Sequence, residues 1–108
     1  MKVPDNFHLL LSQGGATQEF SSVPLNLAGH VYGEPDACAN VLITGKWSEA
    51  GAKEISKFHS INQVNIPSNS SPQQLQKSVL DMDNWNIRKD AKYFYFCQNE
   101  SIDGVELD

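Results

Sequence analysis

The chain has 108 residues, of which 40% are apolar and 19% are charged, and this composition suits one folded domain with a small core. Its formal net charge of −5, with eight basic residues scattered along the chain, argues against a surface for nucleic acid or for an anionic membrane. No stretch is long and apolar enough for a membrane-spanning helix or a signal peptide, so we expect a cytoplasmic protein.

The first half of the chain alternates between apolar runs and helical patterns. Residues 7–11 (FHLLL) lie between polar and turn residues, and this pattern predicts a short strand buried on both faces. A helix is predicted over residues 17–27, where Pro24 would bend it or remove a hydrogen bond. Residues 40–44 (NVLIT) predict a second strand.

The second half continues the alternation. Ser48 is the expected N-cap of a helix that runs to about residue 58, with Ala50, Ile55 and Phe58 facing inward. Further along, the pattern predicts a half-exposed strand at 61–66, a polar loop at 68–74, a short helix at 74–80, a strand at 92–97 and a last strand near 104–107. Strands interleaved with helices predict an α/β fold with a largely parallel sheet.

The cysteines, histidines and acidic residues show no spacing typical of a metal or catalytic site. Cys38 and Cys97 are far apart and form no CxxC motif, so we expect free thiols and neither a zinc site nor a disulfide. The residues expected on the surface or in the core without a catalytic role are His8, His30, His59, Asp81, Asp83, Asp103 and Glu106.

Residues 13–20 (QGGATQEF) connect the first predicted strand to the first predicted helix. Two glycines let the backbone approach an anion closely, and the free amides at the start of a helix favour a phosphate group. The alternative is an ordinary tight turn in which Thr17 is the N-cap, and a Gly-Gly pair alone favours this alternative.

Several short motifs, in the same order along the chain, resemble the phosphoserine aminotransferase family. The longest covers residues 13–27 (QGGATQEFSSVPLNL), which are similar to the family's QGGGxGQFSAVPLNL. The others are VPDNF at 3–7, TGKWS at 44–48, KFHSIN at 57–62, NWNI at 84–87, DAKY at 90–93 and NESIDGVE at 99–106. The resemblance covers nearly the whole chain and is interrupted mainly over residues 67–83.

This resemblance implies the fold of the large domain of pyridoxal-phosphate-dependent transferases, a mixed and mostly parallel sheet with flanking helices. Residues 1–108 would form part of that domain, and its N- and C-terminal parts would be missing. The resemblance also implies pyridoxal 5′-phosphate as cofactor and the conversion of 3-phosphohydroxypyruvate and glutamate, both small molecules, to phosphoserine and 2-oxoglutarate in serine biosynthesis. The full-length family members are homodimers.

Ala16 and Thr17 match the family's loop for the cofactor phosphate. The loop departs from the family pattern at Ala16, Gln18 and Glu19. Glu19 places a carboxylate where the family has an amide, and this charge would repel the phosphate unless the side chain points away.

Two further residues match the family's contacts to the cofactor ring. Trp47 corresponds to a tryptophan that stacks on the pyridine ring, whereas without the resemblance it would be interpreted as a core residue. Ser101 corresponds to a threonine that hydrogen-bonds the phenolic oxygen of the ring, and it keeps the hydroxyl without the methyl group. The alternative for Ser101 is a loop hydroxyl in a local turn.

No residue of the chain matches a catalytic position of the family. The family's cofactor-binding lysine and the aspartate that pairs with the pyridinium nitrogen have no counterpart among residues 1–108, and none of the seven lysines matches. Two hypotheses follow. The chain is part of a phosphoserine transaminase and inactive by itself, or it is a non-catalytic α/β module that binds a phosphorylated ligand or another subunit.

Overall fold

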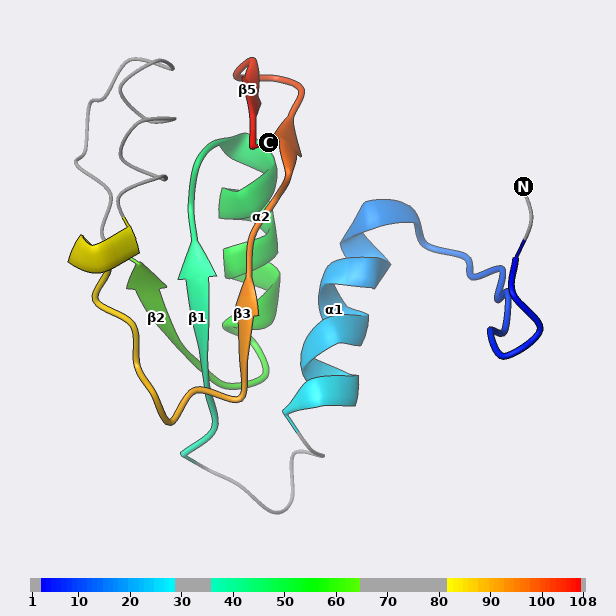
Figure 1. Ribbon diagram of the computed structural model, residues 1–108, viewed down its shortest axis with the longest axis horizontal. Coiled ribbons are helices and arrows are strands. Elements are labelled where there is room, and N and C mark those ends of the chain that lie inside the picture. The colour runs from blue at the N-terminus through cyan, green and yellow to red at the C-terminus, as the bar shows by residue number, and fades with distance from the viewer. Residues whose placement is uncertain (1–2, 29–35, 65–81, 108) are drawn as a thin grey trace.

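A computed structural model describes residues 3–28, 36–64 and 82–107 (Figure 1). Its elements in chain order are α1 (Gly15–Leu27), β1 (Cys38–Leu42), α2 (Lys46–Ile55), β2 (Ser60–Val64), the 3-10 helix η1 (Met82–Asn84), β3 (Tyr93–Tyr95), β4 (Asn99–Glu100) and β5 (Val105–Glu106). The predicted loop at 68–74 and helix at 74–80 lie outside the described residues.

The larger sheet has the strand order β2-β1-β3, and both neighbours of β1 are parallel to it. Parallel neighbours require a crossover connection, and α2 supplies it between β1 and β2 (Figure 1). β4 and β5 form a separate antiparallel pair. The predicted α/β class with a mostly parallel sheet is therefore confirmed.

The core lies between β1 and α2. Ala39 and Val41 of β1 pack against Ala52 and Ile55 of α2, and all four side chains are buried. Because side chains alternate along a strand, residues 39 and 41 face α2 and their neighbours face the other side of the sheet. All five residues of β1 are buried, as expected for the central strand of a covered parallel sheet.

α1 packs beside α2 at the β3 edge of the sheet (Figure 1). The ring of Phe20 meets the ring of Tyr95 edge-on, with 6.2 Å between the centroids. The hydroxyl of Ser21 donates a 2.8 Å hydrogen bond to the carboxylate of Glu54. Glu54 also pairs with Lys57, and these two partners hold its pKa below the ordinary value.

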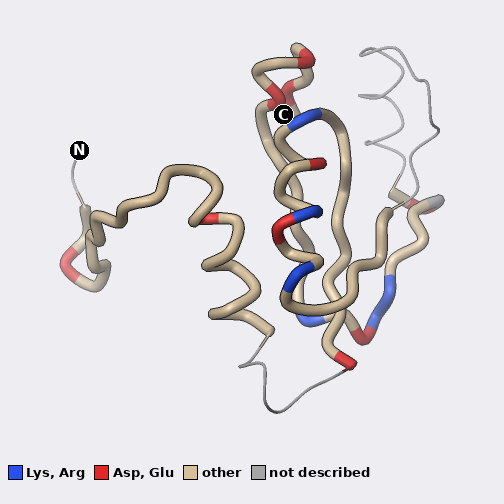
Figure 2. Tube along the Cα trace, turned by 180° about the vertical axis from the view of Figure 1, so that it is seen from behind, with Lys and Arg blue, Asp and Glu red and all other residues tan. Residues whose placement is uncertain are grey.

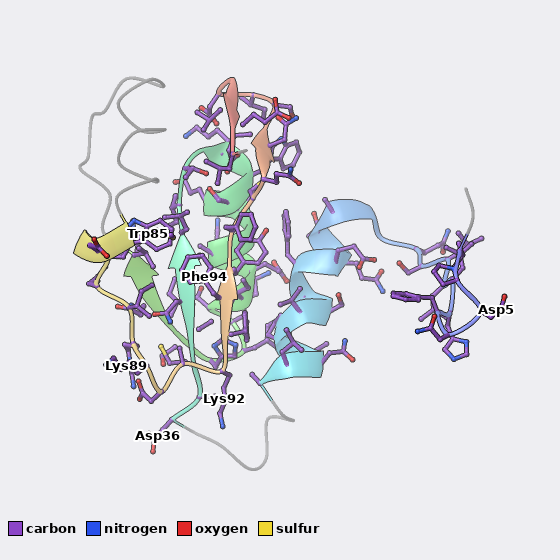
Figure 3. The ribbon with its side chains drawn as sticks, in the orientation of Figure 1. Asp5, Asp36, Trp85, Lys89, Lys92 and Phe94 are labelled. Carbon is purple, nitrogen blue, oxygen red and sulfur yellow. The ribbon has the colours of Figure 1, made fainter. Side chains whose placement is uncertain are left out.

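The segment that follows η1 lies against the opposite face of the sheet. The buried Asn40 side chain accepts hydrogen bonds from Asn62 Nδ2 (2.7 Å) and from the Arg88 amide (3.0 Å), and it donates to the Arg88 carbonyl (2.9 Å). The ring of Trp85 stacks on Phe94 with 5.5 Å between centroids and an interplanar angle of 8° (Figure 3). Trp85 therefore belongs to the face of the sheet that α2 does not cover.

The predicted strand at residues 7–11 is wrong. This segment is irregular and lies apart from the sheet (Figure 1), and its side chains Phe7, Leu9, Leu10 and Leu11 are 64, 73, 85 and 96% exposed. An apolar run forms a strand only if a neighbouring strand can pair with it. Within the described ranges, residues 7–11 pair with no strand.

The other strands form with shifted ends. β1 begins at residue 38 instead of 40 and ends at 42 instead of 44, and β3 covers only the middle of the predicted strand at 92–97. β2 begins at residue 60, and the predicted end of this strand at 66 lies outside the described residues. The last strand, expected near 104–107, is β5.

Both helices begin earlier than predicted. α1 starts at Gly15, contains the buried Pro24 and continues for three more residues to Leu27. α2 starts at Lys46, so Ser48 is its third residue and not its N-cap. α2 ends at Ile55, three residues before the predicted end, and Ala50 is exposed, because Gly51 and Ala52 occupy the buried face instead.

Candidate functional site

α1 begins at two successive glycines in the left-handed region of backbone space, the N-cap Gly14 and the first helical residue Gly15. Gly14 has a φ of 105° and Gly15 a φ of 58°, values that favour glycine because other residues are strained there. Gly14 is the N-cap and contributes no side-chain hydrogen bond. The first helical bond runs from the Gln18 amide to the Gly14 carbonyl (3.4 Å). The preceding amides, including those of Ala16 and Thr17, lack an intrahelical acceptor, which makes this end electropositive.

Thr17 is the third residue of α1, so the alternative in which it is the N-cap is wrong. Ala16 and Thr17 are both exposed. The carboxylate of Glu19 accepts hydrogen bonds from the hydroxyls of Ser12 and Ser22. These contacts hold a negative charge within the first two turns of α1, close in sequence to the amides that would bind an anion.

The N-terminus of α2 differs, because carboxylates of this chain occupy its first three amides. The Lys46 amide donates to Asp103 Oδ2 (2.6 Å), the Trp47 amide to Glu100 Oε2 (2.8 Å) and the Ser48 amide to Glu100 Oε1 (2.8 Å). Acidic side chains are favourable at this end of a helix because of its dipole. α2 therefore offers no free amide of its first turn to a phosphate, and α1 does.

The glycine and serine of residues 44–48 (TGKWS) have structural roles at this junction. The Ser48 hydroxyl accepts hydrogen bonds from the amides of Thr44 (2.8 Å) and Gly45 (3.1 Å). A Cβ atom at position 45 would lie 2.5 Å from Asp103 Oδ2 and 2.8 Å from Glu100 Cδ. Gly45 is thus required for the close approach of the two carboxylates.

Trp47 and Ser101 are in direct contact. The indole Nε1 of Trp47 donates a 3.0 Å hydrogen bond to Ser101 Oγ. The Trp47 side chain is 38% exposed, so the alternative in which it is a core residue is wrong. Because the Ser101 hydroxyl acts as the acceptor in this bond, its own proton can still be donated to another group.

The four predicted cofactor contacts lie at one end of the sheet. β1, β2 and β3 point in the same direction. α1 and α2 begin at the side where these strands finish, and the turn between β4 and β5 lies at the same side (Figure 1). Ligands of open α/β sheets bind at this end. The structure joins Trp47 to Ser101 and places Ala16 and Thr17 at the start of α1, with no hydrogen bond between the two pairs among the described residues.

Charges of both signs are distributed along the chain, and acidic residues mark the turn beside the start of α2 (Figure 2).

Cys38 is buried and Cys97 half-buried, and both are free thiols, as predicted. Burial raises the pKa of the Cys97 thiol, and Glu100 adds to this rise. In the part of the chain that the structure describes, no group of three or more His, Cys, Asp or Glu side chains could hold a metal ion. No helix of these ranges is long and apolar enough to cross a membrane.

The sequence analysis missed Glu100 and misjudged Asp103. Asp103 was expected to be a solvated residue without a role, but its carboxylate accepts the hydrogen bond of the Lys46 amide. The available signal was the glycine that precedes α2. A helix with glycine at its N-cap has no capping side chain there, so its amides require acceptors from elsewhere, and residues 99–106 contain three acidic side chains.

Comparison with curated proteins relates the chain to phosphoserine aminotransferases. No protein-family model matches the chain. Over 107 residues the chain is 36% identical to a phosphoserine aminotransferase of Idiomarina loihiensis, which covers 99% of this chain and 28% of the relative. It is 37% identical to a probable phosphoserine aminotransferase of Caenorhabditis elegans (99% of this chain, 26% of the relative) and 37% identical to a phosphoserine aminotransferase of Drosophila melanogaster (100% and 27%). The chain thus spans about a quarter of the length of these curated relatives.

Proposed function

Because the chain is 36–37% identical to phosphoserine aminotransferases over 99–100% of its own length, we propose that it belongs to this family and forms part of the cofactor-binding large domain of a phosphoserine transaminase. The complete enzyme would transfer the amino group of glutamate to 3-phosphohydroxypyruvate and release phosphoserine and 2-oxoglutarate, a step of serine biosynthesis. It would act as a homodimer in the cytoplasm. The identity to relatives of this name over 99% of the chain supports the proposal.

The cofactor that we propose is pyridoxal 5′-phosphate, and the residues at the carboxyl end of the sheet suit it. The amides of Ala16 and Thr17, at the positive end of α1, would bind the phosphate. The exposed indole of Trp47 would lie against the pyridine ring, and the Ser101 hydroxyl would donate its proton to the phenolic oxygen. When bound, the cofactor supplies an electron sink for carbanion chemistry.

One observation carries this proposal. The resemblance assigns Trp47 and Ser101 to the same ring of the cofactor, although they are 54 residues apart in the sequence. In the structure a single 3.0 Å hydrogen bond joins their side chains. Two residues with the same expected ligand thus converge in space, which an ordinary surface turn would not require.

The role of this chain in the reaction is to bind and orient the cofactor. None of its seven lysines occupies the family's lysine position, so we expect the isolated chain to be inactive. Incubated with pyridoxal phosphate, glutamate and 3-phosphohydroxypyruvate, it should give no turnover. Borohydride reduction should leave no stoichiometric adduct at one lysine. A single modified lysine together with product formation would contradict this expectation.

The decisive experiment is to sequence the transcript downstream of residue 108 and to express the encoded protein. We expect an open frame with an aspartate strand and a lysine loop, and a product that transaminates 3-phosphohydroxypyruvate with glutamate. A stop codon directly after residue 108, or a full-length protein without this activity, would overturn the proposal. A stop codon would support the alternative of a non-catalytic module.

A further inference from the structure

Glu100 is a fully buried carboxylate that accepts hydrogen bonds from three residues of the segment 44–48. Its Oε1 atom accepts from the Ser48 amide (2.8 Å) and from the Thr44 hydroxyl (3.3 Å), and its Oε2 atom accepts from the Trp47 amide (2.8 Å). A buried charge is costly unless it is well hydrogen-bonded, and here two amides at the positive end of α2 and a hydroxyl satisfy it.

Ser101, the residue after Glu100, contacts the side chain of the same tryptophan. Glu100 accepts from the backbone amide of Trp47, and Ser101 accepts from its indole Nε1 at 3.0 Å. The turn that carries both acceptors is itself closed, because the amides of Asp103 (3.0 Å) and Gly104 (2.8 Å) donate to the Glu100 carbonyl. Two successive residues of one short turn thus fix both the backbone and the ring of Trp47.

We propose that Glu100 is a positioning residue, which sets the orientation of the Trp47 indole relative to the Ser101 hydroxyl before any ligand binds. What the oriented pair binds rests on the proposed function, but the orientation itself does not. Glu100 remains out of contact with the ligand and acts through Trp47. The reason is its complete burial beneath the start of α2.

The substitution Glu100→Gln tests this role because it keeps the size of the side chain. The carboxylate accepts through both oxygens, whereas an amide has one oxygen and one NH₂ group. In the variant the NH₂ group must face either the Trp47 amide or the Ser48 amide, and a donor then faces a donor where water cannot enter. Thr44→Val is a milder variant, because it removes only the hydroxyl donor to Oε1.

The chain offers two matched controls. Asp103→Asn changes the other carboxylate at the start of α2, which accepts from the Lys46 amide and makes no hydrogen bond to Trp47. Ile55→Val removes a methylene group from the buried end of the same helix and lowers stability without altering the start of α2. If Glu100 acted only through the overall stability of the fold, Ile55→Val would change the Trp47 indole as much as Glu100→Gln does when the two variants lose the same thermal stability.

The first measurement needs no cofactor. Hydrogen exchange of the Trp47 indole Nε1–H is followed by NMR in the wild type and in each variant, and the Trp85 signal is identified from Trp85→Phe. We expect exchange about tenfold faster in Glu100→Gln, a smaller acceleration in Thr44→Val, and changes below about twofold in both controls. Unchanged exchange in Glu100→Gln and Thr44→Val, or equal acceleration in Ile55→Val, would overturn the inference.

A second measurement separates this inference from the proposed function. Pyridoxamine 5′-phosphate carries the ring and phosphate of the cofactor and cannot condense with lysines, and it is titrated into the complete protein. Wild-type binding that weakens in Glu100→Gln, together with the faster exchange, supports both proposals. If the wild type does not bind while exchange still accelerates in Glu100→Gln, the proposed function fails and the positioning role stands. If the wild type binds and both quantities are unchanged in the variant, the positioning role fails alone.

Discussion

The indole of Trp47 and the hydroxyl of Ser101 form a 3.0 Å hydrogen bond that joins the first turn of α2 to the turn after β4. Part of the indole remains exposed, and the hydroxyl proton of Ser101 is not used in this bond, because the hydroxyl acts as the acceptor. A binding site for an aromatic ring with a polar substituent would use both groups.

The two tryptophans should differ in their effect on the cofactor. In the complete enzyme, we expect Trp47→Ala to weaken binding of pyridoxamine 5′-phosphate about two- to twelvefold, because an aromatic contact contributes about 0.5–1.5 kcal/mol. Trp85→Ala removes the ring that stacks on Phe94 on the other face of the sheet, so it should lower thermal stability and leave affinity within about twofold. Affinity is measured by titration at a temperature at which both variants are folded. Equal loss of affinity in the two variants would show that the pyridine ring does not lie against Trp47.

Glu19 should weaken the binding of phosphate at the start of α1. Its carboxylate, held by Ser12 and Ser22, places a negative charge near the amides that would receive the anion. We expect Glu19→Gln to tighten binding of pyridoxamine 5′-phosphate about two- to fivefold at low salt, with a smaller gain at high salt. Glu49→Gln, which removes an exposed carboxylate of α2, is the control and should leave the affinity unchanged. Equal affinities of wild type and Glu19→Gln across salt concentrations would contradict the prediction.

Alkaline pH should destabilise the fold through Tyr95. Burial raises the pKa of Tyr95 from its ordinary value of 10.0 to about 12, and Cys97 and Glu100 add to this rise. The folded state therefore binds the phenolic proton more tightly than the unfolded state, so this contribution to stability is complete below pH 10.0 and is lost as the pH rises toward about 12. Burial raises the pKa of Tyr93 to about 12 as well.

We therefore expect the free energy of unfolding to fall between these pH values, and to fall less steeply in Tyr95→Phe. Urea unfolding at a series of pH values measures both slopes. Tyr93→Phe is the companion variant, and the double variant should show the smallest slope. A slope in Tyr95→Phe identical to that of the wild type would show that Tyr95 does not carry this dependence.

The exposed apolar segment at residues 7–11 should make the isolated chain self-associate. Leu10 and Leu11 are 85 and 96% exposed, and contiguous exposed apolar side chains promote association. The double substitution Leu10→Lys, Leu11→Lys should keep the chain monomeric to higher concentrations while changing the free energy of unfolding by less than about 0.5 kcal/mol. Sedimentation over a concentration series measures the association. Ile102→Lys, at a single exposed apolar residue of a turn, is the control, and equal improvement in both would contradict the role of this segment.

The order of elements could be predicted from the sequence because its signals are local. Apolar runs and helical periodicity identified α1, β1, α2, β2 and β3 to within a few residues. Helix starts were less accurate. Ser48 was predicted to be an N-cap because of its residue type, whereas its hydroxyl reaches back from the third position of α2 to the amides of Thr44 and Gly45.

The sequence also indicated the four candidate cofactor contacts. The two glycines before α1 suggested an anion site by themselves, but Trp47 and Ser101 were identified only through the motifs of a known family, because nothing in the local pattern distinguishes Trp47 from a core tryptophan. Tertiary structure decided which of them meet. It placed Ser101 against the indole and buried Glu100 beneath α2. The side chains that accept hydrogen bonds from the first turn of α2 lie 52 to 57 residues further along the chain than their donors. It also decided that residues 7–11 form no strand among the described residues, because a strand needs a neighbour with which to exchange backbone hydrogen bonds. Contacts between distant residues depend on how the elements pack, and local periodicity carries no information about that packing.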